Sequence, residues 1–502
     1  MRSTPIGIAL MNDERPHVYN LNNPQNQIVV NRWADIIRQG VRNHDGSAAE
    51  VVVGSEIITS TRVAQKVGEE LARAGCQQII CCYNVWNFPF FIWPLINSFG
   101  RDKPILSLSN NNGEYPGNVG LLATDGALRQ AGLRTHRIVG QQDDPATQQR
   151  VFDWIRAAQA LTTMRNEVYG MYGGHSMGME TGYFHLIPTL KAIGTTVYQI
   201  DQLWLLKRME TIPDAEVERG RRWFEELLGE RLRYDGKMLT PETLSTQVRL
   251  YLAMKAVNEE NGFDLCGLKG QRELTEYIGL GDVPEMLMND PYDWNGPKEP
   301  TVCSTEADSF AALTQQMLKY VSGGLPTLFM DVRLYHPELD LWDFCNSGNH
   351  ASWYAARSWD AAENFKRITF HPALEFYFKA GGASVEFDAA AGPLTFARLG
   401  VWDDQPYMVI AKGESVELPA EQRRALNAQT NPTWPHVHAR LAGSFNEFLT
   451  VFPANHIQAV AGDHVRSLTY LCEIAGITPI ILGEEGKERI APIWERVHYA
   501  SR

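Results

Sequence analysis

Four side chains in the C-terminal third of the chain are of types that bind divalent metal ions. Glu306 and Asp331 are carboxylates, His350 and His456 are imidazoles, and each lies beside an apolar run that predicts a strand or a helix. This set of oxygen and nitrogen ligands suits Mn²⁺ or another divalent first-row ion better than an ion that prefers thiolates. The spacing matches no short motif such as HExxH, so ordinary capping and loop roles for single residues stay open.

These ligand types point to chemistry on a sugar. A divalent ion can bind two adjacent sugar oxygens and polarise a carbonyl group. Moving a carbonyl from C1 to C2 requires one proton to leave C2 and another to arrive at C1, and Glu306 and Asp331 would supply the base and the acid. The residues favour a ketol isomerase. A metal-dependent epimerase or aldolase, and a non-catalytic sugar-binding protein on an α/β scaffold, are the alternatives.

Length and composition limit the class of protein. A chain of 502 residues exceeds one ordinary hydrophobic core, which predicts two to four domains. A hydrophobic content of 44% with 21% charged residues is typical of a globular protein. The net charge of −13 argues against a nucleic-acid partner, because binding phosphates requires a basic surface.

The cysteines and the N-terminus predict a cytoplasmic protein. Seven cysteines is an odd number, and they are scattered through apolar segments, which favours reduced, buried thiols over a disulfide framework. The first residues lack the apolar region and cleavage site of a signal peptide. No run reaches the roughly 18 apolar residues of a membrane span, so no membrane partner is expected.

The first part of the chain alternates strand-like and helix-like patterns. PIGIAL and CQQIICCYNVW predict buried strands, and STRVAQKVGEELARAG between them predicts a helix. This alternation predicts a doubly wound parallel sheet, whose ligands would lie beyond the carboxyl ends of the strands. Asn84, Trp86, Asn87 and residues 110–114 follow predicted strands and could bind a sugar there, or be ordinary loop residues.

A second α/β pattern begins near residue 150 and gives way to a third type of structure. Residues 275–303 predict a long loop, Ser304 and Thr305 predict the cap of a helix with Glu306 in its first turn, and Asp331 lies at the exit of a predicted strand. After about residue 360, short β-runs without intervening helices predict an antiparallel, barrel-like part. The chain is then expected to end in helices, the strand TPIILG and an amphipathic helix. The predicted domains are 1–165 (α/β), 166–328 (α/β) and 329–502 (barrel-like).

Several segments resemble the L-fucose isomerase / L-arabinose isomerase family. They are YGGHSMGMETG with GTTVYQIDQLWLLKRME, then STEADSFAALTQQML, LFMDVR, and PANHIQAVAGDHVRSLTYLCEIAGITPIIL. The ending IWERVHYASR is similar to that of arabinose isomerases. The order and spacing of these segments carry the resemblance, which runs almost from end to end.

The resemblance implies an intramolecular oxidoreductase of carbohydrate metabolism. Enzymes of this family interconvert an aldose and its ketose by proton transfer through a metal-bound cis-enediol. The implied ion is Mn²⁺, with Co²⁺ or Mg²⁺ as substitutes. The implied architecture is two α/β domains before a barrel-like domain, assembled as a homohexamer with sites between subunits. The expected substrate is a hexose, deoxyhexose or pentose, with a 6-substituted anionic sugar such as sulfoquinovose as a further option.

The resemblance also assigns roles to residues. Glu306 and Asp331 become metal ligands and the acid–base pair, His456 the third protein ligand, and Asn455 a substrate contact. His350 matches an additional histidine of the arabinose branch, whereas in the fucose branch it would contact substrate. Asp331 follows the fucose branch, since arabinose isomerases have Glu there, so the chain mixes features of both.

Three more positions are expected to bind substrate. Trp86 falls where the fucose branch places an aromatic side chain over the sugar. Arg15 falls in a segment that reaches a neighbouring subunit's site. Trp434 begins WPHVHAR, which is either a specificity loop or the tip of a structural hairpin. An anionic substituent would need a cationic cluster, for which the candidates are Arg15, His17, His436 and His438.

Overall fold

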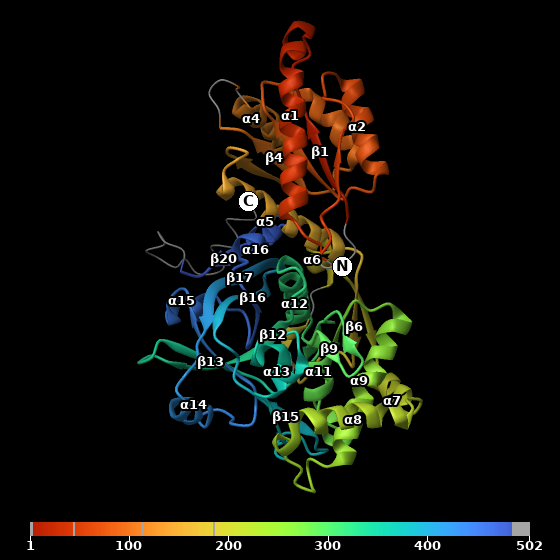
Figure 1. Cartoon of the computed structure of the whole chain (residues 1–502), viewed down its shortest axis with the longest axis vertical. Coiled ribbons are helices and arrows are strands. Elements are labelled where there is room, and N and C mark those ends of the chain that lie inside the picture. The colour runs from red at the N-terminus through yellow and green to blue at the C-terminus, as the bar shows by residue number, and fades with distance from the viewer. Residues whose placement is uncertain are drawn as a thin grey trace. The chain divides into compact units, whose positions relative to one another are not determined.

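The computed structural model describes residues 4–43, 46–111, 115, 117–183, 186–348 and 350–483 (Figure 1). Two compact units make up the chain. The first contains Met1–Thr163 and Arg466–Ile477, and the second contains Met164–Val465 and Thr478–Arg502. The predicted final amphipathic helix lies outside the described residues. The three predicted domains stay a prediction.

The first unit is a parallel sheet with helices, as predicted. The strand order is β2-β1-β3-β4-β5, and every neighbouring pair is parallel. The strands are β1 (Ile6–Leu10), β2 (Val51–Val53), β3 (Gln78–Tyr83), β4 (Ile105–Ser109) and β5 (Thr135–Val139). The helices are α1 (Pro16–Gly40), α2 (Thr61–Arg73), α3 (Ile92–Phe99), α4 (Gly117–Gln130), α5 (Pro145–Met164) and α16 (Val465–Ala475).

Helix α2 shows how local sequence produces these elements. Ser60 caps its first turn by accepting a hydrogen bond from the backbone N–H of Val63. Ala64, Val67 and Leu71 recur at helical spacing and are buried. Helix α2 packs against α3.

The second unit begins with another parallel sheet, ordered β11-β8-β6-β7. The strands are β6 (Val168–Tyr172), β7 (Thr196–Ile200), β8 (Leu265–Leu268) and β11 (Cys303–Thr305). The helices are α6 (Leu186–Ala192), α7 (Gln202–Met209), α8 (Asp214–Leu228), α9 (Pro241–Asn261), α10 (Glu273–Tyr277), α11 (Asp282–Asn289) and α12 (Ser309–Val321).

The prediction of one long loop over residues 275–303 was wrong. Helix α11 lies within it, followed by a short hairpin of β9 (Tyr292–Asp293) and β10 (Gly296–Pro297). Pro284 is tolerated because it occupies the first turn, where a backbone N–H has no partner in the helix. Every residue of α11 is buried, including the polar residues Asp282, Glu285 and Asn289, which recur at helical spacing.

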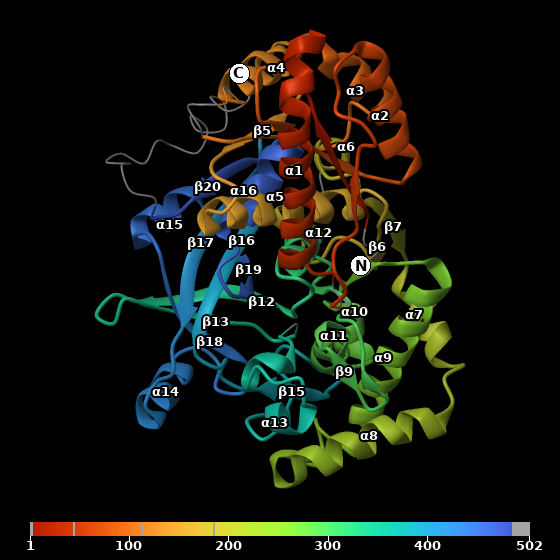
Figure 2. The same ribbon diagram turned by 45° about the horizontal axis from the view of Figure 1, so that its top comes forward.

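The rest of the second unit contains a closed antiparallel barrel, as predicted. The ring runs β16-β19-β12-β13-β18-β17, and β16 pairs with β17 to close it. Figure 2 shows β16 and β17 side by side. The strands are β12 (Thr327–His336), β13 (Leu341–Cys345), β16 (Gly392–Trp402), β17 (Gln405–Ser415), β18 (His436–Leu441) and β19 (His456–Ala461), and β20 (Thr478–Ile481) adds to β17 in parallel.

Short helices flank the β-runs of this region, and the last of them is among the helices predicted toward the end of the chain. They are α13 (Ala361–Phe365), α14 (Ala420–Asn427) and α15 (Phe445–Val451). A short hairpin of β14 (Thr369–Pro372) and β15 (Ala383–Glu386) lies outside the barrel. Helix α12, buried at every residue, packs against β16 and β19 and thus joins the two parts of the unit. In the described residues, no helix combines the length and apolar character that crossing a membrane requires.

Substitution of two glycines tests the helix packing of the first unit. A Cβ at Gly68 would lie 2.4 Å from the backbone oxygen of Leu95 on α3, so Gly68→Ala should lower the free energy of unfolding by about 1–3 kcal/mol. Gly126, in α4, has nothing within 4 Å of such a Cβ, and Gly126→Ala should raise stability by up to about 1 kcal/mol. Urea unfolding followed by circular dichroism measures both. Equal effects of the two substitutions would contradict the packing described.

Candidate active site and metal-binding residues

Glu306 lies in a tight turn between β11 and α12. Glu306 and Ala307 have left-handed backbone angles, with φ of 58° and 51°. The predicted cap at Ser304 and Thr305 was wrong, because these residues belong to β11 and Asp308 caps α12 by accepting from the N–H of Ala311. A left-handed turn at two non-glycine residues is strained, and such strain is concentrated at functional sites.

Asp331 and His456 face each other across paired strands. They are direct partners in the antiparallel register of β12 and β19. The strand β12 continues to His336, so Asp331 lies within it and not at its exit as predicted. His456 Nε2 lies 3.2 Å from Asp331 Oδ1 and 3.3 Å from Glu306 Oε2. The structure therefore brings these three predicted residues together.

The orientation of His456 is set from behind by a buried ion pair. His456 Nδ1 lies 2.7 Å from Asp308 Oδ2, and that oxygen also accepts from Arg398 Nη1 at 2.9 Å. Arg398, Asp308 and His456 are at most 1% exposed. Burial raises the pKa of Asp308, but Arg398 and His456 outweigh it and bring that pKa to about 2. A carboxylate beside Nδ1 fixes the proton there and leaves the Nε2 lone pair for another partner.

The Nε2 lone pair of His456 and the carboxylates of Glu306 and Asp331 are directed toward the same position. Burial lowers the pKa of His456, but the hydrogen bonds to Asp308, Asp331 and Glu306 outweigh it and raise that pKa well above its usual value. A positive charge is therefore strongly favoured at this position. A proton supplies one unit of charge, whereas a divalent ion supplies two and matches two carboxylates. The donor set fits Mn²⁺ and similar ions.

His350 is buried beside this group. It forms a β-bridge with Leu328 of β12, and neither ring nitrogen has a hydrogen-bond partner in the described residues. Burial lowers its pKa to about 3, partly opposed by the charge of Asp331. A neutral buried imidazole offers one N–H and one lone pair, which suits either of its predicted roles, and these roles stay a prediction.

A pocket of about 240 Å³ opens beside Glu306 and Asp331. It is lined by Met177, Lys269, Gly270, Gln271, Thr275, Leu280, Gly281, Asp282, Glu285, Thr305, Glu306, Asp331, Arg333, Asn346, Ser347, Tyr377, Phe378 and Trp434. Trp434 therefore reaches the pocket. Asn455 is not among the lining residues, but its Nδ2 lies 2.8 Å from Nε2 of His456.

The two remaining predicted residues, Arg15 and Trp86, belong to the first unit. Arg15 pairs with Asp13, with Nη2 2.6 Å from Oδ2, and its side chain is largely exposed. Trp86 is half-buried in the loop after β3. Their contact with substrate stays a prediction.

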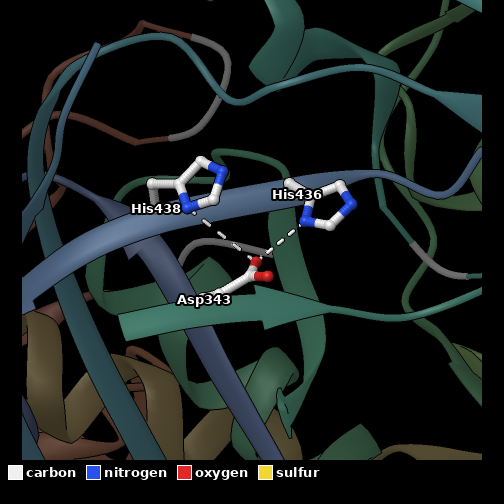
Figure 3. Close-up of side chains that lie close together, drawn as sticks. All are labelled: Asp343, His436 and His438. Carbon is white, nitrogen blue, oxygen red and sulfur yellow. Dashed lines mark hydrogen bonds and ion pairs between the residues drawn. The ribbon is translucent and has the colours of Figure 1, made fainter. Parts of the chain in front are cut away.

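A second cluster of metal-binding side chains lies within the barrel. Asp343, His436 and His438 offer ligand atoms within 4.8 Å of one another, and all three are buried (Figure 3). His436 and His438 were candidates for binding an anionic substituent, but they belong to β18 and do not line the pocket beside Glu306. The interpretation of WPHVHAR as the tip of a hairpin was wrong, because the residues from His436 onward form strand β18.

Sequence reasoning missed the residues that support the site. From the sequence alone, neither Asp308 nor Arg398 is assigned a role. One signal was present, since Arg398 is the only charged residue in PLTFARLGVW, an otherwise apolar strand. Two buried acids, Asp282 and Glu285, were also missed, because α11 was predicted to be a loop.

Asp282 makes stability depend on pH. Burial raises its pKa to about 7, against about 3.9 in an unfolded chain. The stability that protonated Asp282 provides is therefore complete below about pH 4 and is lost as the pH rises through 7. Asp282→Asn should gain up to about 4 kcal/mol relative to the parent between pH 4 and pH 8. Urea unfolding at both values measures this, with the exposed Asp403→Asn as control. A pH-independent difference would contradict the assignment.

Comparison with known proteins identifies the family. Models of three L-fucose isomerase domains match the chain: the first N-terminal domain at residues 3–166, the second N-terminal domain at 238–323 and the C-terminal domain at 344–482. An L-fucose isomerase of Vibrio vulnificus is 26% identical over 465 residues, covering 80% of this chain and 78% of the relative. An L-fucose isomerase of Bacteroides thetaiotaomicron is 25% identical (80% and 79% covered), and that of Haemophilus influenzae is 23% identical (91% and 88% covered). The chain belongs to the L-fucose isomerase family.

Proposed function

We propose that this member of the family is a metal-dependent aldose–ketose isomerase whose catalytic centre is Glu306, Asp331 and His456. The observation that carries the proposal is the convergence of both carboxylates on the Nε2 lone pair of His456, at 3.3 and 3.2 Å. The family supports the reaction class, and its members are intramolecular oxidoreductases acting on sugars. Mn²⁺ is the proposed ion, with Co²⁺ or Mg²⁺ as substitutes.

The side chains divide the reaction between them. Glu306, Asp331 and His456 would hold the ion, which would act as a Lewis acid on the carbonyl group of the open-chain sugar. One of the two side chains, as a carboxylate, takes the proton from C2, and the other, as a carboxylic acid, gives a proton to C1. The hydroxyl proton passes from O2 to O1, which completes the interconversion of aldose and ketose through an enediol. His456 is held by Asp308 with its lone pair toward this centre, so it serves as a ligand and not as a proton carrier.

The pocket suits a single small sugar. Its volume of about 240 Å³ is below the ~300–1,000 Å³ of pockets for larger ligands. Trp434, Tyr377 and Phe378 supply aromatic faces for the C–H surfaces of the sugar, and Gln271, Asn346 and Ser347 supply hydrogen-bonding groups. Asn455, beside His456, is a further proposed contact. A hexose, deoxyhexose or pentose satisfies this lining.

The assembly is part of the proposal. A homo-oligomer, specifically a hexamer, would allow Arg15 and Trp86 of one subunit to reach the site of another. The largely exposed guanidinium of Arg15 is compatible with such a contact. The proposed location is the cytoplasm, which the burial of all seven cysteines supports.

Isomerase activity is tested by NMR in D₂O with Mn²⁺ or with EDTA. The panel is L-fucose, D-arabinose, L-arabinose, D-glucose and sulfoquinovose. We expect metal-dependent conversion of at least one aldose, with deuterium entering at C1 of the ketose and at C2 of the aldose that re-forms. Glu306→Gln and Asp331→Asn should each lower kcat by about 10²–10⁴-fold, because each removes an acid–base group.

The control for these variants is Glu338→Gln, which changes an exposed carboxylate outside the pocket. It should retain full activity. Exchange of a C2 proton without ketose formation would support an epimerase instead, and cleavage of a carbon–carbon bond would support an aldolase. Absence of turnover in protein shown to contain metal would favour the sugar-binding alternative.

Two cations in the pocket favour a substrate with an anionic group. Lys269 and Arg333 both line it. Lys269 Nζ lies 2.9 Å from Glu273 Oε2, and Arg333 lies 5.5 Å above the ring of Trp434. These cations, and not the buried His436 and His438, are the proposed partners of a 6-sulfonate such as that of sulfoquinovose.

Lys269→Gln tests this preference. Losing one charge contact of about 1.4 kcal/mol should raise the KM for the anionic sugar about tenfold and leave the KM for neutral aldoses nearly unchanged. Lys237→Gln removes an exposed lysine that pairs with Glu375, and serves as the matched control. Equal changes for anionic and neutral sugars would exclude an anion-binding role for Lys269.

A further inference from the structure

The cluster of Asp343, His436 and His438 is built from adjacent barrel strands. Asp343 of β13 pairs in register with His438 of β18. His436 and His438 are two residues apart on one strand, so their side chains share a face, and their rings stack with centroids 5.6 Å apart. Figure 3 shows both rings directed toward the carboxylate of Asp343. The three residues are at most 3% exposed.

Hydrogen bonds on the far side of each ring fix the proton positions. His436 Nε2 lies 2.8 Å from the backbone carbonyl oxygen of Asn431, which only accepts, so Nε2 carries a proton. His438 Nε2 lies 2.8 Å from Asn427 Oδ1, and the amide of Asn427 donates to Asp388 Oδ1 at 3.2 Å. Asn427 therefore presents its oxygen to His438, and this Nε2 also carries a proton.

The Nδ1 atoms of both rings are thus directed at one carboxylate oxygen. His436 Nδ1 lies 2.8 Å and His438 Nδ1 lies 3.9 Å from Asp343 Oδ1. The other oxygen, Asp343 Oδ2, accepts from Thr430 Oγ1 at 3.0 Å. Imidazoles that donate one N–H to an oxygen and turn the other nitrogen to a shared point, beside a hydrogen-bonded carboxylate, are typical of metal ligands and their supporting residues.

A proton shared between His436 and Asp343 would explain the contact between these two residues but not the position of His438. If His436 is an imidazolium, its Nδ1–H satisfies Asp343 Oδ1. His438 Nδ1 then has no hydrogen-bond partner in the described residues, although His438 is almost completely buried. An unpartnered buried acceptor costs about 1–3 kcal/mol. One divalent ion between the three residues would instead satisfy both imidazoles and the carboxylate.

We propose that Asp343, His436 and His438 bind a second divalent cation, distinct from the ion proposed at Glu306, Asp331 and His456. Two imidazoles and one carboxylate, all buried, suit a first-row ion such as Zn²⁺. Cys345 Sγ lies 3.7 Å from His436 Nε2, on the protonated side of the ring, and is not a ligand.

The proposed ion has a structural role. It would cross-link β13 and β18 near the ends that lead to the pocket. Asn346 and Ser347 follow β13, Trp434 precedes β18 by two residues, and all three line the pocket. Binding at this second site would therefore stabilise the walls of the substrate pocket without contacting the substrate.

Metal stoichiometry of the full-length chain tests this site. Protein stripped with a chelator is incubated with Zn²⁺, desalted and analysed by ICP-MS. We expect two ions per parent chain, one in Glu306→Gln, one in His438→Gln and none in the double variant. Gln at 438 retains an N–H near the position of Nε2 and removes the Nδ1 lone pair. His371→Gln, at a half-buried histidine that faces Glu386 outside the cluster, is the matched control and should bind two ions.

The outcome at each variant separates the two sites. If His438→Gln binds as many ions as His371→Gln, the cluster is an imidazolium–carboxylate pair and the proposal is wrong. If His438→Gln does not fold, Glu306→Gln decides: a thermal midpoint that rises with added Zn²⁺ supports the second site, and one that does not rise overturns it. Failure of the isomerase proposal would appear as absent turnover, which neither measurement uses.

Discussion

The buried ion pair between Arg398 and Asp308 is the interaction on which the candidate catalytic centre depends. Burying either charge alone would cost several kcal/mol, so each side chain requires the other. Arg398 comes from barrel strand β16, Asp308 caps helix α12, and Asp308 in turn holds His456 on β19. One pair of charges therefore links three elements and sets the direction of the imidazole.

The two groups of the second unit that we propose as metal sites follow the same physical rule. In each, an oxygen acceptor fixes the proton on one ring nitrogen, and the other nitrogen is directed toward carboxylate oxygen. Asp308 does this for His456, while a backbone carbonyl and the Asn427 amide do it for His436 and His438. The groups differ in the pocket that they reach. Glu306 and Asp331 line the pocket that contains Trp434, whereas His438 lines a separate pocket of about 340 Å³ with Asp388 and Arg423.

The sequence predicts the parts of this architecture that depend on interactions between residues close together in the chain. The parallel sheet of the first unit and the antiparallel barrel both follow from strand patterns and their connections. The cap of α12 was misplaced because Ser304 and Thr305 are good capping residues, and only pairing of β11 with β8 assigns them to a strand. Helix α11 was missed because it is short, contains Pro284 and lies in a stretch rich in Pro, Gly, Asn and Asp, a composition that predicts a loop. Arg398 and Asp308 are 90 residues apart, and no short-range pattern encodes their contact.

The same limit applies to the metal-binding side chains. Glu306, Asp331 and His456 could be selected by ligand type and by resemblance, but their convergence depends on the register of β12 with β19 and on a left-handed turn at Glu306. The stretch that contains His436 and His438 was predicted to be a loop or a hairpin tip, and Trp434 and Pro435 precede these histidines. Pairing of β18 with β13 places them beside Asp343 instead.

The division of the first unit between two stretches of sequence affects how the chain is made. Residues 466–477 complete a unit that otherwise ends at Thr163. Within it, Ser467 Oγ donates to Asp153 Oδ1 at 3.2 Å, and His136 Nδ1 lies 2.8 Å from Glu473 Oε2. Synthesis proceeds from the N-terminus, so these contacts form only after nearly the whole chain has left the ribosome. Helix α16 is translated after the entire barrel ring, so the first unit gains its contacts with α5 and β5 only once the barrel strands have been synthesised.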